Sequence, residues 1–139
     1  MKLDLEFTSG TALQAQTGAY ALILDGEDRV LLVRAGNGRF YLPGGRVEPG
    51  ETAEQALARE VEEECGLSVR VGKSLGEAFQ TVFDGSVMLR ASYWRAAIIG
   101  LAHEEPEHQL LWTPRPEAAS RLHRAADAHM LTRGALILG

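Results

Sequence analysis

Residues 45–67 read GRVEPGETAEQALAREVEEECGL, and this stretch decides the fold expected for the chain. Its second half predicts a helix over 53–65, because Thr52 and Gln55 have the spacing of a capping box at a helix N-terminus. Gly66 follows as a residue that readily ends a helix in the left-handed conformation. The stretch therefore predicts a loop that leads directly into a well-capped helix.

The acidic residues of this helix fall on an unexpected face. On a helical wheel, one apolar stripe contains Ala53, Ala56, Leu57 and Val61. Glu60 and Glu64 fall inside that stripe and Glu63 lies at its edge, whereas Glu62 points the opposite way. Inward carboxylates are costly and repel one another unless a cation neutralises them. Because hard divalent cations prefer oxygen ligands, the pattern predicts that Glu60, Glu63 and Glu64 converge on Mg²⁺ or Mn²⁺.

The segment before the helix suits a phosphate-binding role. Gly44 and Gly45 follow Pro43, and glycines let the backbone approach a ligand closely. Glu51 stands just before the predicted helix N-terminus, a position that attracts anionic ligands. Arg59, next to Glu60, can hold a carboxylate in place through a bidentate pair.

The rest of the chain alternates strand patterns with turns and one further helix. Strands are predicted at 17–24, 29–35, 68–83, 87–99 and 109–113, with a short extended segment at 39–42. The dipeptide Asp84-Gly85 predicts a tight hairpin between the two longest strands. Apolar spacing predicts a C-terminal helix over 117–131. This mixed order is typical of an α+β fold, with a mixed β-sheet packed by helices.

The composition limits the function further. The chain has 139 residues, of which 45% are hydrophobic and 24% charged, so we expect one domain over 1–139 and either a monomer or a homodimer. The formal net charge of −5 argues against a nucleic-acid polymer as partner, but it permits a small phosphorylated substrate beside a bound metal.

Neither a membrane span nor a secretory signal is apparent in the sequence. The single cysteine, Cys65, fits a reducing cytoplasm. Residues 1–16 are candidates for an edge strand or a contact with a second subunit.

The stretch also resembles a known family. Gly45, Glu51, the run from Arg59 to Glu64, Gly66 and Leu67 match the Nudix box, G-x5-E-x7-R-E-U-x-E-E-x-G-U, at every fixed position. The bulky apolar positions of the box are filled by Val61 and Leu67. The order of strands around the box also resembles the Nudix fold, an α/β/α sandwich, over roughly residues 15–135.

This resemblance implies an activity, namely hydrolysis of a nucleoside diphosphate linked to another group, with Mg²⁺ or Mn²⁺ as cofactor. By position in the box, Glu60, Glu63 and Glu64 would bind the metal, with the Gly44 carbonyl as a further ligand. Arg59 would orient the carboxylates and Glu51 would support the loop. The general base is either Glu60 or a glutamate outside the box. Candidates outside the box are Glu104, Glu105 and Glu107, of which Glu107 is also a candidate metal ligand.

Substrate contacts are predicted close to the box. Gly44 and Gly45 are candidates through their backbone, and Arg34 and Arg39 through their guanidinium groups, although surface arginines of no special role are common. Phe40 and Tyr41 are candidates for stacking on a base, with core packing as the competing interpretation.

The class of substrate follows only by elimination. ADP-ribose hydrolases of this family tend to have a proline about fifteen residues beyond the box, and residues 81–83 contain none. Dinucleoside-polyphosphate hydrolases tend to have a tyrosine slightly further on, and Tyr93 is too distant for an easy match. A nucleoside triphosphate or a related nucleotide is the remaining expectation. The alternative is a module of the same fold that senses or binds a nucleotide without hydrolysing it.

Overall fold

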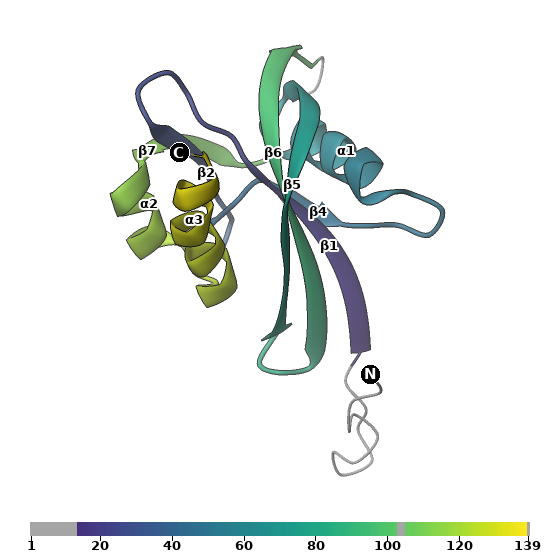
Figure 1. The fold of residues 1–139 in the computed structure, drawn as a ribbon. Helices are drawn as coiled ribbons and strands as arrows, with labels where there is room; N and C mark the ends of the chain where they lie inside the picture. The colour runs from purple at the N-terminus through teal and green to yellow at the C-terminus, as the bar shows by residue number, and fades with distance from the viewer. Residues whose placement is uncertain (1–13, 103–104, 139) are drawn as a thin grey trace.

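The computed structural model describes residues 14–102 and 105–138 of the chain. Figure 1 shows strands flanked by helices on two sides. The elements are β1 (Gln14–Leu22), β2 (Arg29–Arg34), β3 (Phe40–Tyr41), β4 (Gly44–Arg46), α1 (Ala53–Cys65), β5 (Leu67–Val82), β6 (Val87–Leu101), β7 (Gln109–Pro114), α2 (Arg115–Arg121) and α3 (Ala125–Leu138). Most of residues 1–16, as well as Glu104, lie outside the described residues.

The strands form two sheets. A mixed four-stranded sheet has the order β4-β1-β6-β5, in which β1 runs parallel to β6 and antiparallel to β4. A smaller antiparallel sheet has the order β3-β2-β7. The predicted α+β class with a mixed sheet between helices is confirmed, and the antiparallel three-stranded sheet accompanies it.

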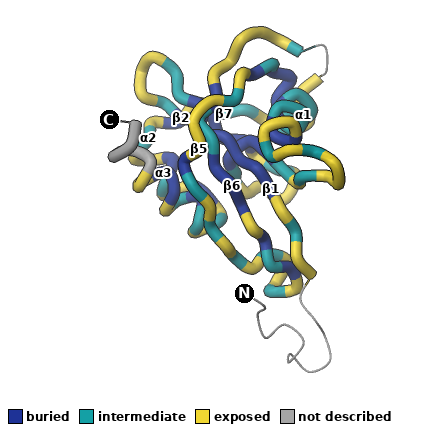
Figure 2. The backbone as a smooth tube through the Cα atoms, turned by 45° about the vertical axis from the view of Figure 1, so that its right-hand side comes forward, coloured by how far each residue is buried: buried dark blue, intermediate teal, exposed yellow. Residues whose placement is uncertain are grey.

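The second half of β1 and the middle of β6 are buried on both faces, as Figure 2 shows. Successive side chains of a strand point to opposite faces. Accordingly, Ala19 and Ala21 pack with α1, whereas Tyr20 and Leu22 pack with α2 and α3. The helices close the two cores with apolar residues, which are Leu57, Val61 and Cys65 on one side and Ala118, Met130 and Leu131 on the other. The result is a three-layer arrangement in which α1 and α3 cover opposite faces.

Helix α1 has the predicted bounds. The Thr52 hydroxyl accepts a hydrogen bond from the Gln55 N–H, and the Gln55 side chain accepts one from the Thr52 N–H, which completes the capping box. Gly66 has φ +65°, and its N–H donates to the Glu62 carbonyl. These local signals fix where the helix begins and ends.

The predicted helix over 117–131 is wrong as a single element. Leu122 is extended and buried, and it separates α2 from α3. The cause is tertiary, because Leu122 forms a bridge with Phe40 and the His123 N–H donates to the Phe40 carbonyl at 2.9 Å. Pairing with β3 therefore interrupts an apolar pattern that would suit a continuous helix.

The strand boundaries also differ from the prediction, by up to three residues. Strand β1 begins at Gln14 and ends at Leu22, and the short strand β4 has no counterpart among the predicted elements. The hairpin at Asp84-Gly85 is confirmed, but four residues connect its strands, and Phe83 and Asp84 have φ of 53° and 56°. Among the residues that the structure describes, no helix is long and apolar enough to cross a membrane.

Candidate active site

The acidic face of α1 lies where the helical wheel places it. Ala56, Leu57 and Val61 are buried against the strands. Beside them, the side chains of Glu60 and Glu64 are only 18% and 16% exposed, whereas that of Glu63 is 41% exposed. Two carboxylates are therefore half-enclosed by the body of the fold and the third stands at its edge.

Glu64 is held by the strand that precedes the helix. The Gly44 N–H donates to Oε1 of Glu64 at 2.9 Å, and Nε2 of His108 lies 3.8 Å from Oε2. Burial raises the pKa of Glu64 to about 8, and the charges of Glu60, Glu107 and Glu63 add to this, while the Gly44 N–H opposes it. The carboxylate thus lies in a site that disfavours its charge unless a cation approaches.

Glu60 lies against Gly45, which accounts for glycine at the first position of the stretch 45–67. A Cβ atom on Gly45 would lie 2.1 Å from Oε2 of Glu60, far closer than atoms pack. Burial raises the pKa of Glu60, with a further contribution from Glu63, while Arg59 lowers it. Gly45 therefore leaves the space in which the Glu60 carboxylate lies.

Arg59 and Glu51 form a bidentate ion pair. Nε of Arg59 donates to Oε2 of Glu51 at 2.7 Å, and Nη2 donates to Oε1 at 2.9 Å. The same Nη2 also donates to the Arg46 carbonyl at 3.0 Å. Arg59 holds the pKa of Glu51 down at about 2, and the Glu51 carboxylate in turn raises the pKa of Arg59. The pair ties the loop and β4 to the middle of α1.

The three carboxylates of α1 are neighbours, but they do not converge as predicted. Within 14–102 and 105–138, no three acidic, histidine or cysteine side chains come together closely enough to hold a metal ion. Arg59 contacts two of them, because its Nη1 lies 3.4 Å from Glu63 and 3.8 Å from Glu60. The Gly44 N–H holds Glu64 separately.

The donor set nevertheless fits a hard divalent cation. It consists of carboxylates only, two of which have a raised pKa because burial disfavours their charge. Outside α1, Glu105 and Glu107 are exposed, and the Glu107 N–H donates to the Glu64 carbonyl at 3.0 Å. Glu107 is therefore adjacent to the site through its backbone, and its charge reaches Glu64.

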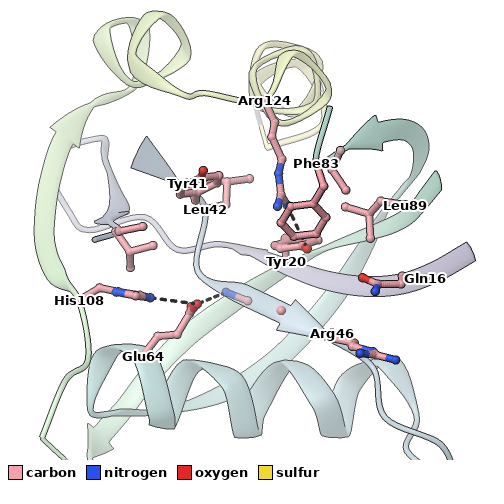
Figure 3. Close-up of a pocket in the computed structure, with 15 residues that line it drawn as sticks. Gln16, Tyr20, Tyr41, Leu42, Arg46, Glu64, Phe83, Leu89, His108 and Arg124 are labelled. Atoms are coloured by element: carbon pink, nitrogen blue, oxygen red, sulfur yellow. Dashed lines mark hydrogen bonds and ion pairs between the residues drawn. The ribbon is translucent and has the colours of Figure 1, made fainter. Parts of the chain in front are cut away.

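A cavity of about 300 Å³ opens beside Glu64. Figure 3 shows Glu64 and His108 at one end and Arg124, Tyr41 and Phe83 toward the other, with Tyr20 between them. Gly44 and Gly45 form part of its wall. Tyr20 and Arg124 were not predicted from the sequence, since no local pattern marks a contact between residues 104 positions apart.

The predicted substrate-contact residues do not all reach this cavity. Tyr41 lines it, as do Gly44 and Gly45. Arg39 instead lines a neighbouring groove, where its Nη1 lies 3.0 Å from Nε2 of His123. Arg34 is exposed and stacks over the Phe40 ring at 6.0 Å, and neither residue lines the cavity.

Comparison with known proteins now identifies the family. A family model described as the NUDIX domain matches residues 14–135. The chain belongs to the Nudix family. Its Nudix box covers the last two residues of β4, the following loop, the whole of α1 and the first residue of β5.

Two curated relatives match part of this chain. A putative 8-oxo-dGTP diphosphatase from Bacillus subtilis is 40% identical over 60 residues, which cover 42% of this chain and 40% of that protein. An ADP-ribose pyrophosphatase from Methanocaldococcus jannaschii is 45% identical over 58 residues, which cover 39% of this chain and 34% of that protein. The chain thus matches well under half of the length of each of these relatives.

The fold has close structural counterparts over most of the chain. The crystal structure of the MutT protein from Methanosarcina mazei superposes with a TM-score of 0.74 at 24% identity. The superposition covers 87% of this chain and 93% of that one. This likeness shows that the chain has a MutT-like Nudix fold.

Proposed function

We propose that this chain hydrolyses the diphosphate linkage of a nucleoside triphosphate or a related nucleotide, in a reaction that depends on Mg²⁺ or Mn²⁺. One observation carries the proposal. Glu64, a carboxylate of the Nudix box, forms the wall of a cavity that is also lined by Tyr41 and Arg124. A charged site for the phosphates therefore adjoins a pocket of suitable size and chemistry for a nucleoside.

Glu60, Glu63 and Glu64 are the residues that would hold the metal, with the Gly44 carbonyl and Glu107 as further candidate ligands. When bound, a divalent ion would activate water and offset charge on the phosphoryl oxygens. The ion pair of Arg59 with Glu51 fixes the loop against α1, and this holds β4 beside the helix. Gly44 and Gly45 keep the backbone close to the carboxylates without a side chain in the way.

The bond changes follow from the products expected. Water attacks the α- or the β-phosphorus of the triphosphate, and the phosphorus–oxygen bond between these two groups breaks. Pyrophosphate leaves after attack at the α-phosphorus, and the nucleoside monophosphate leaves after attack at the β-phosphorus. The water proton passes to a carboxylate, for which Glu60 and Glu107, whose charges both act on Glu64, are the described candidates. The products are a nucleoside monophosphate and pyrophosphate.

The choice of nucleotide rests on two supports. Residues 81–83, which line the cavity and the adjoining groove through Val82 and Phe83, lack the proline expected of ADP-ribose hydrolases. In addition, the relative from Bacillus subtilis is named for a nucleoside triphosphate. These supports favour a triphosphate over ADP-ribose as the substrate, although the relative from Methanocaldococcus jannaschii is named for ADP-ribose.

A nucleotide panel tests the proposal. The purified chain is incubated with deoxynucleoside triphosphates, ADP-ribose and dinucleoside polyphosphates, each with Mg²⁺ and with a chelator, and the nucleotide products are separated by chromatography. Nucleotide binding is measured separately by isothermal titration calorimetry. We expect turnover of a triphosphate with Mg²⁺ only. Metal-independent turnover would refute the metal assignment. Nucleotide binding without turnover on any substrate would instead establish the non-hydrolysing module.

A further inference from the structure

Arg124 has an unusual environment for a cation. It lies just before α3, is only partly exposed, and lines the cavity beside Glu64. Its Nη1 donates to the Tyr20 hydroxyl at 3.1 Å. Its guanidinium carbon lies 5.1 Å from the centre of the Tyr41 ring and 5.7 Å from that of Tyr20. Two aromatic rings therefore hold the guanidinium group in a fixed orientation.

Most hydrogen-bond donors of Arg124 have no acceptor within the described part of the fold. In the described part of the chain, Arg124 forms no ion pair, and the Tyr20 hydroxyl is the only hydrogen-bond acceptor that it meets. A guanidinium group has five N–H donors, and partly buried arginines normally engage several of them. The remaining donors are therefore available to a ligand in the cavity.

A buried carboxyl group, that of Asp127, follows Arg124 in the chain. Asp127 is fully buried one turn along the chain, and its Oδ1 accepts a hydrogen bond from the Tyr93 hydroxyl at 2.6 Å. Burial raises the pKa of Asp127, while the Tyr93 hydroxyl and the positive charge of Arg124 oppose that rise.

The rest of the cavity suits a flat ring. Leu42 and Leu89 supply apolar surface, and Phe83 projects over the cavity from the β5–β6 hairpin (Figure 3). Glu64 lies at the opposite end from Arg124 in the same view. A nucleotide whose phosphates lie at Glu64 would therefore place its base among these apolar groups, with one edge toward Arg124.

We propose that Arg124 selects the base of the nucleotide by donating hydrogen bonds to a ring carbonyl, so that guanine-type bases are preferred over adenine. The inference rests on the proposed function, because it takes the phosphates to lie at the box. The guanidinium group can donate hydrogen bonds but cannot accept them. The O6 and N7 atoms of guanine both accept, whereas adenine presents an amino donor in place of O6. Guanine and its 8-oxo form share the carbonyl at position 6.

The test is the ratio of kcat/KM for dGTP to that for dATP, measured with Mg²⁺. We expect the wild type to favour dGTP by about tenfold or more. Arg124→Gln should abolish or reverse this preference, since a glutamine amide matches the adenine edge. The matched control is Arg121→Gln. It removes an exposed arginine that pairs with Glu117 and lies outside the cavity, and it should keep the wild-type ratio.

The outcomes separate this inference from the function on which it rests. Wild-type turnover of both nucleotides without a preference for dGTP would overturn the inference and leave the proposed function standing. An equal fall in kcat/KM for both nucleotides in Arg124→Gln would also overturn it, because it would indicate a phosphate contact or a structural role.

If thermal melting shows that Arg124→Gln does not fold, Arg124→Lys is measured in its place. Lysine keeps the charge without the planar pair of donors, so the ratio should still fall. Turnover of no nucleotide by the wild type would refute the proposed function itself.

Discussion

At the scale of single residues, neighbouring glutamates of α1 have very different surroundings. Glu64 accepts a hydrogen bond from Gly44 and lines the cavity, and Glu63 lies near Arg59 at the edge of the site. Glu62, between Val61 and Glu63 in the chain, is predicted from the wheel to point away from this face. Function is therefore expected to depend on position along the helix rather than on its total charge.

This difference predicts the effect of removing one charge. Glu63→Gln should lower kcat by several orders of magnitude, because it removes a metal-binding carboxylate while helix propensity hardly changes. Glu62→Gln is the matched control and should keep near-normal activity. Steady-state kinetics at limiting Mg²⁺ measures both variants. Equal activity of the two variants would show that Glu63 does not bind the metal.

A second residue-scale prediction concerns pH. Arg59 lowers the pKa of Glu51 from 4.5 to about 2, so the folded state favours the charged carboxylate. The resulting stabilisation is present above the unfolded pKa and is lost as the pH falls through the folded pKa. The melting temperature of Glu51→Gln should therefore lie below that of the wild type at neutral pH, and the gap should narrow between pH 4.5 and about 2.

Thermal melts across this range in low salt measure the gap. Glu54→Gln serves as the control, since Glu54 is exposed on the same helix and forms no ion pair in the described part of the chain. The difference in melting temperature between Glu54→Gln and the wild type should change less with pH than the difference for Glu51→Gln. A gap for Glu51→Gln that stays constant down to pH 3 would contradict the assigned ion pair.

At the scale of elements, the packing of α1 against β4 defines the site. The close approach depends on Gly45, since any Cβ there would overlap the Glu60 carboxylate. Gly45→Ala should displace Glu60 and strongly reduce Mg²⁺-dependent turnover while the protein still melts cooperatively. Gly36→Ala is the matched control, because a Cβ at Gly36 meets no atom within 4 Å. Undiminished activity of Gly45→Ala would show that the position of Glu60 is unimportant.

The elements also show what can be predicted from sequence. The bounds of α1 and the positions of its carboxylates follow from caps and periodicity, which are local signals. The break at Leu122 and the short strand β4 arise from pairing with Phe40 and Tyr20, which are distant in the chain. The contribution of Arg124 to the cavity is nonlocal for the same reason. Box residues and Tyr41 were thus predictable, whereas Tyr20 and Arg124 in the cavity wall were not.

At the scale of the whole molecule, one buried hydrogen bond joins the four-stranded sheet to α3. Tyr93 donates to Asp127, whose other oxygen has no partner in the described structure. Tyr93→Phe should destabilise the fold by about 1–3 kcal/mol, because it leaves a buried carboxyl group without its hydrogen bond. Tyr41→Phe removes only an exposed contact with Asn37 and should cost less. Urea denaturation measures both, and equal costs would contradict this account of the core.

The central claim is metal-dependent cleavage between the α- and β-phosphoryl groups, and the products test it most directly. The measurement is a phosphorus NMR spectrum of dGTP incubated with the wild-type chain, once with Mg²⁺ and once with a chelator. We predict dGMP and pyrophosphate with Mg²⁺ and unchanged dGTP with the chelator. An unchanged spectrum in both samples, or release of orthophosphate with dGDP, would contradict the claim.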